Sequence, residues 1–95
     1  MAAYVIGQVQ VTDPEAYRAY AEQVPATVAK YDGEYLVRGG EVETLEGDWP
    51  QERMVVLRFP DMNRARAWYG SEDYRGPKAI RHRVSTANLV LVEGV

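Results

Sequence analysis

The sequence contains no cysteine and only one histidine, His82. Without cysteine, the chain can form no disulfide and offers no thiolate to a metal ion, and one histidine without a histidine–carboxylate spacing does not predict a metal site. No apolar run approaches the roughly 18 residues that a membrane-spanning helix needs. We therefore expect a protein that binds no metal and does not span a membrane.

Basic residues are too few for a general nucleic-acid binder, because 11 lysines and arginines stand against 14 acidic residues, a formal net charge of −3. Such a binder needs a basic face to displace counterions from phosphates, so nucleic acid is not expected as a partner. The sequence has no phosphate-binding loop, dinucleotide-binding glycine fingerprint or Gly-x-Ser-x-Gly motif, so we predict no cofactor. The N-terminus has no basic region, which predicts no signal peptide and a cytoplasmic location.

Alternation of apolar and polar residues predicts four strands. Their expected ranges are residues 3–12, 34–38, 53–59 and 86–92. A glycine pair at residues 39–40 predicts a bulge or a sharp bend after the second strand, because glycines in a strand weaken its regular pairing. Residues 41–46 are expected to continue this strand past the bend.

Helical spacing of apolar residues predicts two main helices between these strands. Asp13 and Pro14 form a typical cap and first turn, and Pro25 is expected to kink or divide the helix that follows. Asp61 is expected to cap the second helix. A further short helical segment comes next, and the glycine–proline pair at residues 76–77 is expected to limit its regularity.

The element order is strand, helix, strand, strand, helix, strand, which is the split βαβ pattern of a ferredoxin-like fold. We therefore predict one α+β domain over residues 1–95, with an antiparallel sheet and its helices on one face. The first, third and fourth strands carry apolar residues on both faces, although a sheet face open to water should alternate with polar residues. A second copy of the sheet is the simplest cover for that face, so we expect a homodimer.

Short motifs are spread along the whole chain. They are residues 11–17 (VTDPEAY), 31–33 (YDG), 36–40 (LVRGG), 45–49 (LEGDW), 59–60 (FP), 67–69 (AWY) and 88–94 (NLVLVEG). Together they resemble an uncharacterised domain family of about this length in the dimeric α/β-barrel, ferredoxin-like superfamily. The resemblance implies a ferredoxin-like subunit whose sheet packs on that of a second copy to form a dimeric α/β barrel.

The same resemblance leaves the activity open. The superfamily includes cofactor-free monooxygenases, muconolactone isomerase-like enzymes, haem-degrading enzymes, chlorite dismutases and ligand-sensing regulatory domains, and the fold does not choose among them. One hypothesis is a cofactor-independent enzyme, monooxygenase- or isomerase-like, that acts on a small acidic or carbonyl compound. The other is a non-catalytic ligand-binding or regulatory dimer.

Four residues are candidates for a ligand-binding site: Arg38, Tyr20, Tyr74 and Asn88. Arg38 precedes the glycine pair, where a bend lets a ligand approach. Its guanidinium either binds a carboxylate ligand or forms an ion pair, with a glutamate of residues 41–46 or across the dimer. Tyr20 and Tyr74 either belong to the core or orient a polar ligand through their hydroxyl groups. Asn88 is polar in an otherwise apolar strand, and it faces either a cavity or another polar side chain.

The remaining polar residues give a weaker signal. Arg53 and Arg58 carry the same ambiguity as Arg38, between anion binding and ion pairing. His82 has a pKa range suited to acid–base catalysis, but two flanking arginines favour its neutral ring, and we interpret it as a surface residue. The acidic side chains show no arrangement typical of a catalytic pair.

Overall fold

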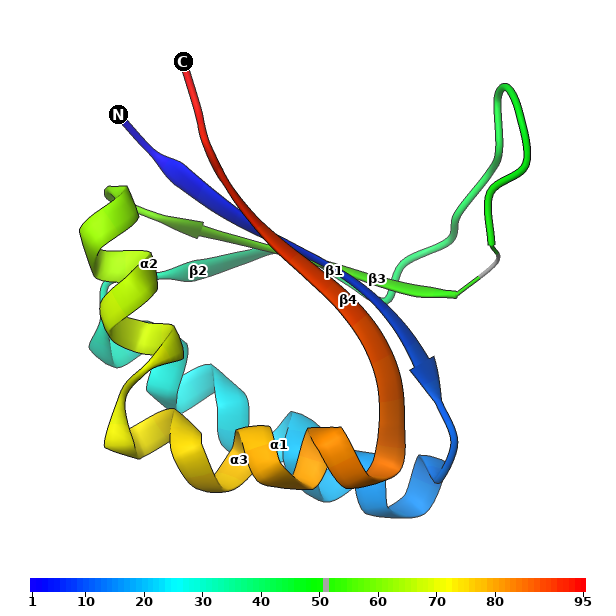
Figure 1. The fold of residues 1–95 in the computed structure, drawn as a ribbon, viewed down its shortest axis with the longest axis horizontal. Coiled ribbons are helices and arrows are strands. Elements are labelled where there is room, and N and C mark those ends of the chain that lie inside the picture. The colour runs from blue at the N-terminus through cyan, green and yellow to red at the C-terminus, as the bar shows by residue number, and fades with distance from the viewer. Residues whose placement is uncertain (51) are drawn as a thin grey trace.

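The sheet and its helices form two layers in the computed structural model, which describes residues 1–50 and 52–95 (Figure 1). The elements are β1 Ala3–Val11, α1 Pro14–Lys30, β2 Glu34–Arg38, β3 Arg53–Phe59, α2 Met62–Tyr69, α3 Glu72–Val84 and β4 Ser85–Glu93. The strands pair antiparallel in the order β2-β3-β1-β4, with the described helices on one face of the sheet. None of these helices has the length and apolar character needed to cross a membrane. The predicted α+β, ferredoxin-like arrangement is confirmed.

α1 continues unbroken through Pro25, so the predicted division of the helix is wrong. Asp13 caps the helix, as predicted, by accepting a hydrogen bond from the Ala16 amide at 3.2 Å. Pro25 has no amide hydrogen and therefore leaves the Ala21 carbonyl, one turn earlier, without its helical donor. Arg38 supplies a donor instead, with its Nη2 2.7 Å from Ala21 O. A side chain of β2 thus replaces the backbone hydrogen bond that proline removes.

α3 is also more regular than predicted, because it continues through Gly76 and Pro77 without interruption. Ser71 caps it by accepting a hydrogen bond from the Tyr74 amide at 3.1 Å. The buried residues of α3 recur at helical spacing, and they are Tyr74, Pro77, Arg81 and Val84. Pro77 belongs to this buried stripe, so tertiary packing outweighs its low helix propensity.

β2 ends before residues 41–46, so the predicted continuation of this strand is wrong. The register shifts between Tyr35 and Val37, so the bulge lies inside β2, and the glycine pair instead forms the predicted bend at Gly39. Gly39 donates its amide to Met54 O at 2.8 Å, and its left-handed φ of 72° then turns the chain away from β3. Figure 1 shows the segment that follows projecting from the sheet as a loop.

Trp68 is the side chain at which the helices and the sheet meet. Only 1% of it is exposed, and its ring centroid lies 4.2 Å from that of Tyr74 and 5.4 Å from that of Phe59. Its Nε1 donates to Thr27 Oγ1 of α1 at 3.0 Å, and this hydroxyl donates to Val24 O at 2.8 Å. The indole is therefore both closely packed and hydrogen-bonded, as a buried tryptophan requires.

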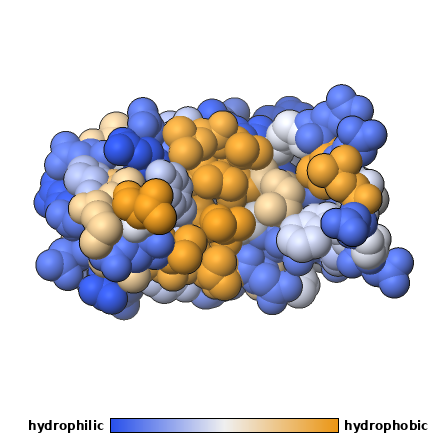
Figure 2. Space-filling model, turned by 90° about the horizontal axis from the view of Figure 1, so that it is seen from above, coloured by the Kyte–Doolittle hydropathy of each residue, from blue (hydrophilic) through white to orange (hydrophobic). Residues whose placement is uncertain are grey.

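The sheet face opposite the helices, called the outer face below, is open and largely apolar. Val37, Val90 and Val92 are 38%, 57% and 45% exposed, and the strand register places Ile6 between Val90 and Val56 on this face. Figure 2 shows apolar atoms gathered in a band across the molecule when it is seen from the side of the sheet. The strands thus carry apolar residues on both faces, as the sequence pattern predicted.

Gly33→Ala is expected to destabilise the fold, because its methyl carbon would lie 2.6 Å from a Phe59 ring atom and 2.8 Å from a Val28 methyl carbon. Overpacking of this kind lowers the free energy of unfolding by about 1–3 kcal/mol, which urea denaturation measures. Gly76→Ala is the matched control, because beyond its chain neighbours and its own helical backbone no described atom lies within 4 Å of the added carbon. Alanine in a helix gains about 0.5–1 kcal/mol over glycine, so equal stabilities of the two variants would contradict this packing.

Candidate functional site

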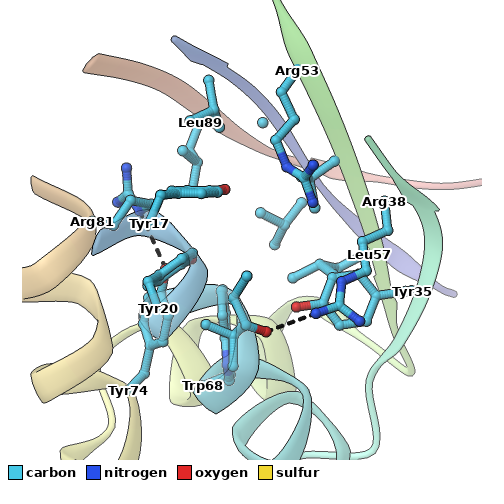
Figure 3. Close-up of a pocket in the computed structure, with 16 residues that line it drawn as sticks. Tyr17, Tyr20, Tyr35, Arg38, Arg53, Leu57, Trp68, Tyr74, Arg81 and Leu89 are labelled. Atoms are coloured by element: carbon cyan, nitrogen blue, oxygen red, sulfur yellow. Dashed lines mark hydrogen bonds between the residues drawn. The ribbon is translucent and has the colours of Figure 1, made fainter. Parts of the chain in front are cut away.

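A cavity lies between α1, α3 and the helix-facing side of the sheet (Figure 3). Apolar residues of β1 and β3 line one wall, and aromatic residues line much of the other. Three arginines complete the lining: Arg38, Arg53 and Arg81. The volume of the cavity is about 40 Å³, which is room for roughly three waters. A ligand larger than this volume therefore shifts side chains at the mouth.

Arg38, a predicted site residue, lines this cavity from the end of β2. Besides its hydrogen bond to Ala21 O, its guanidinium lies 4.9 Å from the Tyr35 ring centroid. Within the described part of the chain, it forms no ion pair with the glutamates of residues 41–46. Its side chain is exposed, so the guanidinium is free to exchange the Ala21 carbonyl for an oxygen of a ligand.

Arg53 and Arg58 lie on one strand but on opposite faces of the sheet. Arg58 points to the outer face and pairs with Glu34 at 3.4 Å. Arg53 lines the cavity 5.6 Å from the Tyr17 ring centroid, and its buried Nε has no hydrogen-bond partner among the described residues. Gly39 leaves room for this guanidinium, since an added Cβ would collide with it. A buried N–H without an acceptor is costly, so Arg53 Nε is a donor available to a ligand.

Arg81 is the cavity residue that sequence reasoning missed. It is 5% exposed, its Nε donates to Tyr74 Oη at 3.4 Å, and its Nη2 lies 3.2 Å from His82 Nε2. Burial acts to lower the pKa of Arg81, but the hydrogen bond and charge of Tyr74 oppose it and the net shift is upward. The available signal was helical spacing, which places Arg81 seven residues after Tyr74 on the buried stripe. The expected irregularity at residues 76–77 concealed it.

The hydroxyl groups of Tyr20 and Tyr74, both predicted site residues, lie 2.8 Å apart and share a hydrogen bond. Tyr20 comes from α1 and Tyr74 from α3, and both side chains are buried. Burial raises the pKa of Tyr20 far above its ordinary value, and Tyr74 adds to that shift. Burial also raises the pKa of Tyr35 to about 12. Tyr20 and Tyr35 therefore keep their protons at neutral pH and do not act as bases.

Asn88 and His82 lie outside the cavity. Asn88 is exposed on the outer face, opposite Gln8 of β1, so the structure separates it from the other three predicted site residues. His82 is exposed near the end of α3, as predicted, and its pKa is lowered by slight burial and by nearby cationic side chains. The cavity thus brings together one predicted arginine and both predicted tyrosines.

The charged residues that line the described cavity are all positive. Its described lining contains no aspartate or glutamate, and no described residue forms an ion pair with any of the three arginines. Nor do the described residues include a group of three or more His, Cys, Asp or Glu side chains able to hold a metal ion. Guanidinium groups beside aromatic rings suit an anion or a carbonyl oxygen, because they donate in a fixed planar geometry.

A four-stranded antiparallel sheet with helices on one face and a cationic cavity between the layers defines a small ferredoxin-like α+β protein. Residues 2–95 match the domain of unknown function DUF1330, and the chain belongs to this family. The resemblance inferred from the sequence motifs is therefore confirmed. No curated protein matches the sequence.

Solved structures share this fold at low sequence identity. A protein of unknown function from Rhodopseudomonas palustris, RPA0582, gives a TM-score of 0.78 at 15% identity, covering 99% of this chain and 82% of that chain. A dimeric ferredoxin-like protein of unknown function from Jannaschia sp. CCS1 gives a TM-score of 0.75 at 8% identity, covering 99% of this chain and 100% of that chain. SnoaB, a cofactor-independent oxygenase from Streptomyces nogalater, gives a TM-score of 0.65 at 14% identity, covering 99% of this chain and 93% of that chain. At such identities, the similarity shows the fold alone.

The raised phenol pKa values predict a loss of stability in alkali. Above a pH of about 10, tyrosines of the unfolded chain ionise, whereas Tyr35 keeps its proton up to about pH 12 and Tyr20 has an even higher pKa. The folded state then holds more protons than the unfolded state, so the free energy of unfolding falls as the pH rises through this window. Urea denaturation from about pH 9 to 11 should show a shallower fall for Tyr35→Phe than for the parent chain. Equal slopes would contradict the buried state of Tyr35.

Proposed function

We propose that the protein is a homodimer that binds a small acidic or carbonyl compound in this cavity and acts on it as a cofactor-independent enzyme, oxygenase- or isomerase-like. The observation that carries this proposal is the convergence of Arg38, Arg53 and Arg81 on an aromatic cavity whose described lining has no acidic residue. An anion in the cavity compensates their charge. The hydrogen-bonded pair of Tyr20 and Tyr74 orients it.

The chemistry that such a cavity favours is stabilisation of an enolate. Hydrogen bonds from a guanidinium to an anionic oxygen are roughly twice as strong as neutral ones, and they strengthen where water is excluded. A bound carbonyl compound therefore loses its α-proton more readily, because the enolate oxygen lies against fixed positive charge. An enolate either reacts with oxygen or takes up a proton at another carbon. SnoaB, which is described as a cofactor-independent oxygenase, has the same fold.

A non-catalytic ligand-binding or regulatory dimer is the second candidate. Tyr20 and Tyr35 stay protonated and Arg81 stays charged, so none of these groups acts as a general base at neutral pH. His82, the residue type best suited to that role, is exposed outside the cavity. A proton released from the ligand must then pass to water at the mouth, which favours binding over rapid catalysis.

Support for the homodimer comes from the outer face. Exposed Val37, Val90 and Val92 form part of an apolar surface of the sheet that the helices leave uncovered, and contiguous apolar surface of this kind marks an interaction site. The similar protein from Jannaschia sp. CCS1 is described as dimeric and ferredoxin-like. Packing of two outer faces against each other buries this surface and produces the dimeric α/β barrel.

Pyruvate tests the ligand site, because it carries a carboxylate beside an enolisable ketone. NMR in D₂O measures both the binding of pyruvate and the exchange of its methyl protons for deuterium. The enzyme hypothesis predicts that the protein accelerates this exchange. The non-catalytic alternative predicts saturable binding without accelerated exchange. Arg53→Met should weaken binding about tenfold or more, because one charge-assisted hydrogen bond is lost. Arg18→Met, an exposed arginine on α1, is the control. Unchanged affinity in Arg53→Met would contradict the site.

Val90→Lys is expected to convert the dimer into monomers, because a buried, unpaired lysine at the sheet interface is costly. Sedimentation velocity measures the change in assembly. Ala26→Lys places the same charge on the exposed side of α1 and should leave the dimer intact. A monomeric parent chain, or a Val90→Lys dimer as stable as the parent, would contradict the outer-face interface.

A further inference from the structure

The three cavity arginines come from two sides of the fold. Arg38 and Arg53 belong to β2 and β3, which form one half of the sheet. Arg81 belongs to α3, which packs on α1 and against β4 at the opposite edge. Figure 3 shows Arg81 across the cavity from the other two guanidinium groups, with Tyr17 between them and Arg81. The positive charge is therefore divided between two ends of one cavity.

Each end holds cationic donors without an acidic partner among the described residues. At one end, Arg53 Nε is buried and unpartnered, and Arg38 donates to the Ala21 carbonyl. At the other end, Arg81 is 5% exposed and is held by the Tyr74 phenol oxygen and a neighbouring imidazole nitrogen. A buried charge destabilises a protein unless it is paired. Each end is thus suited to one anionic oxygen group.

The wall between the two ends is apolar. Val5 and Val9 of β1 and Leu57 of β3 line it, together with Gly7. A methyl group added at Gly7 would meet Leu89 Cγ at 3.6 Å, which is ordinary contact, so glycine leaves space here that a side chain would fill without strain. The middle of a bound molecule therefore contacts hydrocarbon and finds its polar partners at the ends.

We infer that the ligand is a compact organic acid with an anionic group at each end and an apolar link between them: a dicarboxylate, or a keto acid in its enolate form. This inference rests on the proposed function, because it specifies the compound that the same cavity takes. Arg81 binds one end, and Arg38 with Arg53 binds the other. The cavity has room for only about three waters, so a ligand of this size draws the exposed Arg38 side chain away from Ala21.

The first test compares ligands on the unmodified protein by isothermal titration calorimetry. Succinate, glutarate and adipate carry two carboxylates, and butyrate, pentanoate and hexanoate are their matched acids with one. At least one dicarboxylate should bind about tenfold or more tightly than its matched acid, because it engages both ends. Equal affinities within every pair would overturn the two-ended inference and leave the anion site standing. Absence of binding by every acid would overturn both.

Arg81→Gln tests which residue forms the second end. The dicarboxylate should lose its advantage and bind no more tightly than the matched monocarboxylate, whose own affinity falls much less because the Arg38 end remains. Arg75→Gln is the control, because this exposed arginine of the same helix pairs only with Glu72 in the described structure. An equal loss of affinity for both acids would overturn the assignment of Arg81 to one end.

Two milder variants test the inference even if the Arg81→Gln substitution disturbs the buried side of α3. Arg81→Lys keeps the charge but loses the planar pair of donors, so the preference for the dicarboxylate should fall several-fold. Gly7→Ala keeps every arginine and narrows the apolar middle, so it should weaken dicarboxylate binding while urea denaturation shows a stable fold. An unchanged preference in both variants would overturn the inference.

Discussion

The burial of one indole ring fixes the arrangement of the helical layer. Trp68 belongs to α2, its ring packs beside Tyr74 of α3 and Phe59 of β3, and its N–H is bound by Thr27 of α1. A buried tryptophan needs close packing and an acceptor together, so the helices satisfy it only when all of them hold one relative position. Trp68 also lines the cavity, which means that close packing ends on one side of this ring and the cavity begins there. The stability of the fold and the shape of the site therefore depend on the same aromatic cluster.

A second constraint joins α1 to the sheet, because a side chain of β2 replaces a backbone hydrogen bond that Pro25 prevents. Pro25 leaves the Ala21 carbonyl without its helical donor, and Arg38 binds that carbonyl across the mouth of the cavity. The same guanidinium is thus both a structural partner of α1 and a cation of the site. Gly39, the next residue, makes the space that the Arg53 guanidinium occupies. Pro25, the adjacent pair Arg38 and Gly39, and Arg53 come from separate parts of the sequence and together shape one entrance.

The sheet could be predicted from the sequence because period-two alternation is a local property, and the residues of 53–59 and 86–92 show it directly. The division of α1 expected at Pro25 and the irregularity of α3 expected at Pro77 are both wrong. Local patterns do not contain the reason, since a distant arginine and tertiary packing compensate for these prolines. Arg38, Tyr20 and Tyr74 were found by residue type, but their convergence depends on helix–sheet packing. The position of Asn88 was already contained in the alternation of β4, which places it on the face that the helices leave open.

The three cavity guanidinium groups form no ion pair among the described residues, so the stability of the protein should depend on the anions around it. An anion that binds the folded chain and not the unfolded one raises the free energy of unfolding by mass action. The melting temperature therefore depends on the chain and on the anions dissolved around it. It should differ between a phosphate buffer and a chloride buffer. In a living cell, where the unfolded fraction is removed by proteases, the amount of this protein would follow the concentration of any anion that binds the cavity.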